Sequence, residues 1–184
     1  MSVSTSNTTL DNLMAAFNGE SNAHSNYAAF AKKADEEGYT QVASLFRAAS
    51  RAEEIHFSNH AAVIRKMGGD PKAVVNAPIV KSTAENLKTA IAGETYERDV
   101  MYPDFIAKAK ATNDKAAVRT FSYALAAETE HAALYTEASN NLSAWKGGKK
   151  EFFVCPICGK TVIKVDFSAC SVCGTPREKF EKIV

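Results

Sequence analysis

The stretches EEIH at Glu53–His56 and ETEH at Glu128–His131 share the pattern Glu-x-x-His. Each follows a Gly-Glu pair, Gly19–Glu20 or Gly93–Glu94, by 33 or 34 residues. Residues three apart on a helix lie on one face about a turn apart, so the Glu and His of each motif can reach one site. The repetition therefore predicts three metal-binding side chains presented twice by long helices, the arrangement that holds two metal ions inside a four-helix bundle.

Size and composition exclude several classes of protein. The 184 residues suit one domain or a medium domain with a small one. A formal net charge of +1 gives no field that would attract nucleic acid or an anionic membrane surface. No apolar run approaches the length of a membrane span. The N-terminal MSVSTSNTTL has neither a basic leader nor an apolar core, so we expect no secretory signal and a cytoplasmic protein.

Four helices are predicted, each with apolar residues at three- and four-residue steps. Their expected ranges are 9–37, 41–67, 82–111 and 114–142. The third opens with Ser82-Thr83-Ala84-Glu85, which has the spacing of a capping box. Pro103 is expected to kink it. The segment 68–81 is too long for a tight hairpin and suits a crossover along a ferritin-like bundle.

Acidic and imidazole groups occupy inward positions of these apolar stripes. Glu20, for example, follows Leu13 and Phe17 on the first helix. Burying an unpaired carboxylate costs several kcal/mol or forces it to bind a proton. Such groups on four helices therefore predict bound cations rather than solvated helix charge. The seven are Glu20, Glu53, His56, Glu94, Glu97, Glu128 and His131.

The donor types indicate which metal is bound. Carboxylates can bridge two ions and imidazole binds one, and this oxygen and nitrogen set suits iron or manganese better than a thiolate site does. Four carboxylates would balance two divalent ions. The fifth, Glu97, has Ala23 as its counterpart in the first half, and its extra charge favours redox cycling over passive storage. His24 and His60 lie a turn further along their helices and are weaker ligand candidates.

The two halves of the helical region are related in sequence. AFNGES at 16–21 resembles AIAGET at 90–95, an offset of 74, and the Glu-x-x-His motifs repeat at an offset of 75. Each half is therefore expected to be a helix hairpin, related to the other by an approximate two-fold axis. Such a pairing naturally produces a site for two metals.

Composition changes after the fourth helix. We expect residues 1–145 to form the bundle, and residues 146–184 to form a linker and a small β-rich domain that needs a staple to fold. Two Cys-x-x-Cys-Gly knuckles predict a four-thiolate site made by Cys155, Cys158, Cys170 and Cys173. Without an export signal, metal binding is favoured over disulfides. Spacing alone does not separate structural zinc from a one-iron electron-transfer centre.

Together, these motifs resemble a rubrerythrin over nearly the whole chain. The matching stretches are GES at 19–21, EEGY at 36–39, both Glu-x-x-His motifs, Glu94-x-x-Glu97, the four cysteines and GTPREKF at 174–180. The resemblance implies an all-α ferritin-like bundle with two iron ions, followed by a rubredoxin-like domain with one iron. It also implies a cytoplasmic peroxidase that reduces hydrogen peroxide to water, forms a homodimer and receives electrons from a reductase or rubredoxin.

The resemblance also implies roles for single residues. The seven inward groups become the di-iron ligands, with Glu53 and Glu128 bridging the two ions. One iron is implied to shift between His56 and Glu97 as its redox state changes. Tyrosines near the irons are a further feature of the family, and the matching residues are Tyr27 and Tyr102.

Some features leave other readings open. Lys160 and Ser171 stand where rubredoxin-like units usually carry an aromatic residue and a proline, so zinc remains an alternative at the cysteines. A ferroxidase that uses oxygen, with iron as its substrate, is a second functional hypothesis. A non-enzymatic zinc-ribbon interaction module is a third. It predicts a basic or aromatic ribbon surface. Little support for it comes from Lys149, Lys150, Lys160 and Lys164, because acidic residues interrupt the set.

Overall fold

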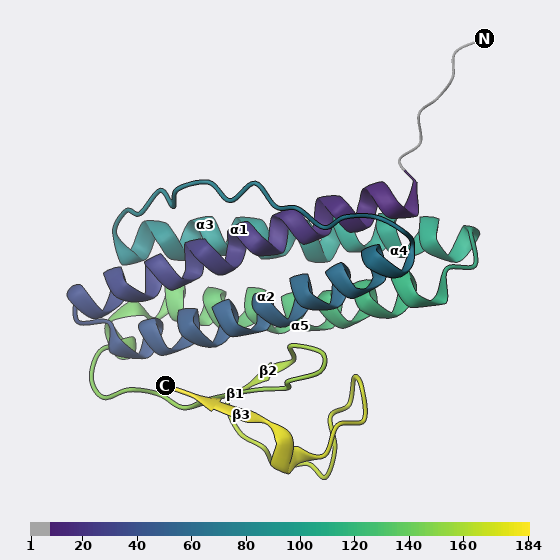
Figure 1. Ribbon diagram of the computed structural model, residues 1–184. Helices are drawn as coiled ribbons and strands as arrows, with labels where there is room; N and C mark the ends of the chain where they lie inside the picture. The colour runs from purple at the N-terminus through teal and green to yellow at the C-terminus, as the bar shows by residue number, and fades with distance from the viewer. Residues whose placement is uncertain (1–7) are drawn as a thin grey trace.

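The computed structural model describes residues 8–184 as a helical bundle with a small sheet beneath it (Figure 1). Residues 1–7, part of the stretch where we expect no leader, lie outside the described residues. The helices are α1 (Thr9–Glu36), α2 (Thr40–Lys66), α3 (Thr83–Tyr96), α4 (Tyr102–Ala111) and α5 (Lys115–Asn140). The predicted ferritin-like bundle is thus confirmed. Within residues 8–184, no helix is both long and apolar enough to span a bilayer.

Side-chain caps fix where three helices begin. Ser82 accepts a hydrogen bond from the Glu85 N–H and Glu85 bonds back, so the predicted capping box is present. A second capping box joins Thr8 and Asp11 at the start of α1. Asp114 accepts from the Ala117 N–H at the start of α5. Each cap stabilises its helix by about 1 kcal/mol.

The third predicted helix is not continuous. A five-residue π-helix, η1 (Glu97–Met101), separates α3 from α4. We expected a kink at Pro103, but the irregularity lies just before this proline, which occupies the first turn of α4. π-Bulges are frequent at functional sites, and this one begins at Glu97.

An extended crossover links α2 to α3, as the sequence predicts, and runs along α1 (Figure 1). Two asparagines of α1 hold it. Asn18 Oδ1 accepts from the Val74 N–H at 2.8 Å, and Asn22 Oδ1 accepts from the Asn76 N–H at 2.9 Å. These bonds position the crossover beside the turn of α1 that carries Glu20.

The apolar core is divided along the bundle. One cluster contains Phe46 and Tyr135, and the other contains Tyr102 and Phe121. On α1 and α5 the inward acidic residue falls between the segments that supply the two clusters. Glu128, for example, lies between Phe121 and Tyr135. The polar centre is therefore closed at both ends by packed aromatic rings.

The C-terminal unit is a small antiparallel sheet. Its strands are β1 (Phe152–Val154), β2 (Thr161–Val162) and β3 (Glu181–Ile183), in the order β2-β1-β3. One 3-10 turn, η2 (Leu142–Trp145), precedes the sheet, and a second, η3 (Arg177–Lys179), lies between β2 and β3. The expected β-rich unit is confirmed. The boundary at residues 145–146 stays a prediction, because Phe152 and Val154 belong to the same apolar cluster as Phe46 of the bundle.

Candidate metal centre

Four buried carboxylates and two imidazoles meet at the middle of the bundle. The six are no more than 1% exposed and come from α1, α2, α3 and α5. Two groups of donor atoms, each within 4.8 Å of one another, can hold a metal ion. The first group is Glu20, Glu53, His56 and Glu128, and the second is Glu53, Glu94, Glu128 and His131. Glu53 and Glu128 belong to both groups, as bridging ligands would.

The two imidazoles are arranged alike. His56 Nδ1 lies 2.8 Å from Glu53 Oε2 and 3.0 Å from Glu128 Oε1. His131 Nδ1 lies 2.8 Å from Glu128 Oε2 and 3.4 Å from Glu53 Oε1. Each histidine thus turns the same ring nitrogen inward, towards both shared carboxylates. This arrangement agrees with the approximate two-fold relation expected from the sequence.

Within residues 8–184, the buried carboxylates of the centre lack some of their hydrogen-bond partners, as expected of an anionic site that binds cations. Each histidine Nδ1 is hydrogen-bonded to the glutamate of its own motif. Among the described residues, one oxygen of each of four buried carboxylates is then left without a hydrogen bond: Glu20 Oε2, Glu53 Oε1, Glu94 Oε2 and Glu128 Oε1. Burial, followed by repulsion from neighbouring carboxylates, raises the pKa of Glu20 and Glu94 well above its usual range. Leaving such groups uncompensated is costly. Two cations would partner all four oxygens, so the residues fit a di-metal centre.

Glu97 stands apart from the other six. It is half-buried at the start of η1, and it is in neither donor group. Burial, followed by the nearby Glu94 carboxylate, raises its pKa well above the usual range. Its Oε1 lies 4.0 Å from the place where a Cβ on Gly19 would stand. The glycine before Glu20 therefore leaves space beside this carboxylate, and a ligand role for Glu97 remains a proposal.

The two expected tyrosines bond to carboxylates of the opposite half. Tyr27 donates to Glu94 Oε1 at 2.7 Å, and Tyr102 donates to Glu20 Oε1. Tyr102 follows Glu94 by eight residues, whereas Tyr27 follows Glu20 by seven. The π-helix between Glu94 and Tyr102 absorbs the additional residue, so both hydroxyls reach equivalent positions.

The weaker histidine candidates lie outside both donor groups. His24 Nδ1 is 2.8 Å from the Ser50 carbonyl oxygen. His60 is fully buried, and its Nδ1 lies 3.0 Å from Thr120 Oγ1. Burial, followed by the charge of His56, lowers the pKa of His60 to about 3, so its ring is neutral. The His56–His60 spacing of one helical turn marked His60 in the sequence, but nothing there indicated its contact with Thr120.

The four cysteines converge as predicted. None is in a disulfide, and their sulfurs lie within 4.8 Å of one another. Gly159 and Gly174 follow the two knuckles, each with a φ of 77°, the left-handed conformation that favours glycine. A hydrogen bond from Cys158 lowers the pKa of Cys155 to about 4. Four converging sulfurs, three from buried cysteines and one from the partly exposed Cys173, fit a tetrahedral thiolate-bound ion.

The small domain is docked on α2 and α5 of its own chain. His56 Nε2 lies 3.2 Å from the Cys158 carbonyl oxygen, and His131 Nε2 lies 3.0 Å from Thr161 Oγ1. The histidines of the bundle centre therefore contact the first knuckle and the strand after it. Asn59 of α2 adds a hydrogen bond to the Ile157 carbonyl at 2.9 Å.

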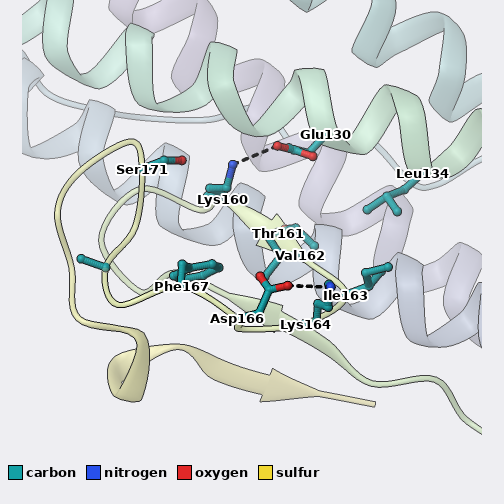
Figure 2. Close-up of a pocket in the computed structure, with 11 residues that line it drawn as sticks. Glu130, Leu134, Lys160, Thr161, Val162, Ile163, Lys164, Asp166, Phe167 and Ser171 are labelled. Carbon is teal, nitrogen blue, oxygen red and sulfur yellow. Dashed lines mark hydrogen bonds and ion pairs between the residues drawn. The ribbon is translucent and has the colours of Figure 1, made fainter.

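Charged pairs hold the rim of this contact. Lys160, the residue that departs from the rubredoxin-like pattern, reaches Glu130 of α5 at 2.9 Å (Figure 2). These residues line a cavity between α5 and the loop after β2, with a volume of about 410 Å³. Lys164 pairs with Asp166 at its edge (Figure 2). Lys160 and Lys164 are thus paired with acidic residues of the same chain, which gives no support to the interaction-module hypothesis.

The fold and the two clusters define a ferritin-like carboxylate–histidine protein with an attached four-thiolate domain. The family model described as Rubrerythrin matches residues 11–139. Nigerythrin of Nitratidesulfovibrio vulgaris is 43% identical over 173 residues, covering 94% of this chain and 85% of that protein. Rubrerythrin-2 of Clostridium acetobutylicum is 35% identical, covering 94% and 95%. A solved structure of fully reduced, all-ferrous nigerythrin matches with a TM-score of 0.89 at 40% identity, covering 98% and 89% of the two chains.

The chain belongs to the rubrerythrin family. A bacterioferritin structure from Desulfovibrio desulfuricans, with a TM-score of 0.68 at 20% identity, shares the bundle fold. The family carries a di-iron site and a four-cysteine iron site, and this chain presents donors for both. Its cofactors are therefore two iron ions in the bundle and one at the cysteines. The protein is an iron-dependent oxidoreductase of the rubrerythrin type.

Proposed function

We propose that this protein is a peroxidase that reduces hydrogen peroxide to water, with electrons entering through the four-cysteine iron. The contact between His56 Nε2 and the Cys158 carbonyl carries the proposal. It joins a proposed ligand of the bundle centre to a proposed ligand of the thiolate centre. A protein that only stored iron would have no need of a second redox centre at this place.

The proposed ligands divide into bridging and terminal sets. Glu53 and Glu128 would be shared by the two ions because their oxygens belong to both donor groups, while His56 and His131 would each hold one ion. When bound, the iron pair supplies the two electrons that cleave the O–O bond, and the thiolate iron passes replacements singly. Glu97 is the proposed adaptable ligand. Its half-buried carboxylate lies beside Gly19 and outside both donor groups, so it would have to move to bind an ion.

The remaining side chains hold protons and exclude water. Tyr27 and Tyr102 donate to Glu94 and Glu20, so each keeps a proton next to the centre. Both tyrosine rings are buried within the aromatic clusters that close the two ends of the polar centre. A dry site strengthens these polar contacts and limits side reactions.

Rapid mixing of the fully reduced protein with hydrogen peroxide or with oxygen tests the proposal. Peroxide is expected to oxidise the bundle iron much faster than oxygen does. Faster reaction with oxygen, together with uptake of added ferrous iron, would instead establish a ferroxidase. A Cys158→Ser variant is the control. It should react once with peroxide when chemically reduced, yet fail to turn over with an electron donor, because the entry centre is lost.

The same proposal includes the protein's surroundings. We expect a cytoplasmic homodimer supplied by a reductase or rubredoxin. Exposed apolar residues on the crossover and at η1 support a partner surface: Val74, Ile79, Tyr96 and Val100. Light scattering of the iron-loaded protein checks the dimer, and a monomer would remove this part of the proposal.

A further inference from the structure

A buried row of hydrogen bonds runs from α5 to the bundle centre. Thr120 Oγ1 lies 3.0 Å from His60 Nδ1. His60 Nε2 lies 3.2 Å from the Tyr102 hydroxyl. Tyr102 in turn donates to Glu20 Oε1. Four different helices thus supply four consecutive members of one row, and the proposed function so far uses only the last two.

The hydrogens in this row all point towards Glu20. The single hydroxyl hydrogen of Tyr102 is committed to the carboxylate oxygen. The bond between His60 and Tyr102 therefore requires a hydrogen on His60 Nε2, and a neutral imidazole then has a bare Nδ1 that accepts. Among the described residues, the Thr120 hydroxyl is the group placed to donate to that nitrogen. One tautomer of His60 satisfies every contact and aligns each donor inward.

The outer end of the row meets a surface cavity. Thr120 lines a cavity of about 100 Å³ between α2 and α5, whose other lining residues include Asn59, Lys66 and Arg119. This volume admits water molecules. His60 and Tyr102 are fully buried, whereas Thr120 keeps 5% of its surface exposed. The row therefore connects a place that solvent can enter with one that it cannot.

Within residues 8–184, the other half of the bundle has no such row. At the offset of 75, Tyr135 stands opposite His60 and Leu45 stands opposite Thr120. Leu45 is fully buried, and among the described residues the Tyr135 hydroxyl has no hydrogen-bond partner. The hydrogen bond from Tyr27 to Glu94 is therefore not continued towards the surface. The connection to the surface belongs to one side of an otherwise two-fold site.

We propose that Thr120 and His60 relay protons from this cavity through Tyr102 to Glu20. The inference rests on the proposed function, because reduction of one hydrogen peroxide to two waters consumes two protons together with two electrons. It assigns Thr120 and His60, which lie outside the ligand set, to the delivery of protons for that reaction. Asn59 lines the cavity and also bonds to Ile157 of the small domain, so protons and electrons enter on the same face.

Each transfer leaves the residues without a net change of charge. A proton from water in the cavity binds Thr120 Oγ1, and the original hydroxyl proton moves to His60 Nδ1. The His60 Nε2 proton moves to the Tyr102 oxygen, and the Tyr102 proton moves to Glu20 Oε1 and on to the reduced oxygen. Hydroxide stays in the cavity and is neutralised by bulk solvent. Each passage delivers one proton and leaves His60 as the Nδ1–H tautomer.

Substitution at Thr120 tests the relay in the iron-loaded protein. Thr120→Val keeps the shape and removes the hydroxyl, and we expect kcat for peroxide to fall by about tenfold or more with KM unchanged, since positioned proton transfer typically contributes 10²–10⁴-fold. Thr120→Ser restores the hydroxyl and should return kcat to within about twofold of the wild type. Tyr135→Phe, which removes the unpartnered hydroxyl of the other half, should leave kcat unchanged.

A second readout does not depend on turnover. In protein loaded with zinc, NMR should show His60 protonated at Nε2, and deuterium should replace this proton more slowly in Thr120→Val than in the wild type or Thr120→Ser. Equal kcat or equal exchange in Thr120→Val and the wild type overturns the relay. If the wild type consumes no peroxide, the proposed function fails instead, and the exchange comparison alone then decides whether the row conducts protons.

Discussion

Gly159 and Gly174 offer a direct measure of what docking of the small domain contributes. Both follow a cysteine knuckle with a φ of 77°, but only Gly159 faces the bundle. A Cβ on Gly159 would overlap His56 Nε2 and stand 2.8 Å from Cδ2 and 3.1 Å from Cε1 of the same ring. A Cβ on Gly174 would meet nothing within 4 Å. Alanine would therefore strain the backbone at both positions, but it would clash with His56 only at position 159.

The expected difference follows from the contacts at Gly159. Left-handed backbone costs an alanine about 1–2 kcal/mol at either position. His56 is fully packed, so Gly159→Ala must also move the knuckle outward, which breaks the bonds of His56 to the Cys158 carbonyl and of Asn59 to the Ile157 carbonyl. At about 0.5–1.5 kcal/mol for each hydrogen bond, Gly159→Ala should destabilise the small domain by about 1–3 kcal/mol more than Gly174→Ala does.

Denaturant unfolding of the iron-loaded variants, followed by the thiolate-iron absorption, measures this difference. Native absorption in both variants would show that the knuckles still bind iron. Gly159→Ala should also slow reduction of the bundle iron by an electron donor, while Gly174→Ala should not. Equal stabilities and equal reduction rates in the two variants would refute the docking geometry and the route of electron entry.

Three further predictions concern other contacts. Hydrogen bonds from Arg51 are the main cause that lowers the pKa of Glu181 from 4.5 in the folded protein. The pair should therefore stabilise docking fully above pH 4.5, and this stabilisation should be lost as the pH falls through the lowered pKa of Glu181. Arg51→Met should therefore cost up to about 1 kcal/mol in denaturant unfolding at neutral pH and less at pH values of about 3, and an equal cost at both would contradict it. Cys158→Ser should lower the iron content from three ions to two per chain by metal analysis, and retention of the third would show that three sulfurs suffice. Tyr27→Phe should lower the stability of the metal-free protein by about 1–3 kcal/mol because Glu94 loses a buried donor, whereas Tyr135→Phe should cost almost nothing.

Local spacing was enough to predict the bundle and the centre. Glu53 with His56, and Glu128 with His131, are fixed on one face by helical geometry, and their place within apolar stripes predicts burial. The cysteine knuckles are equally local. These features need only the repeat of a helix or a tight turn, so the sequence determines them without knowledge of distant contacts.

Contacts between elements could not be predicted in the same way. Thr120 and His60 are 60 residues apart, and their meeting depends on the rotation of α2 against α5. The docking of Cys158 on His56 depends on the path of a linker whose length permits several placements. The position of Glu97 outside the two donor groups depends on η1, although the change of offset from 74 to 75 was a visible sign of it.

The π-helix also bears on how the two halves diverged. A single inserted residue between Glu94 and Tyr102 widens one turn and leaves the flanking segments in phase, so both tyrosines still cross to the opposite carboxylate. The widened turn begins at Glu97, whose counterpart in the other half is Ala23. The inserted residue thus allowed one half of an ancestral repeat to specialise without disturbing the other. One half kept its regular helix, and the other gained the widened turn that carries Glu97.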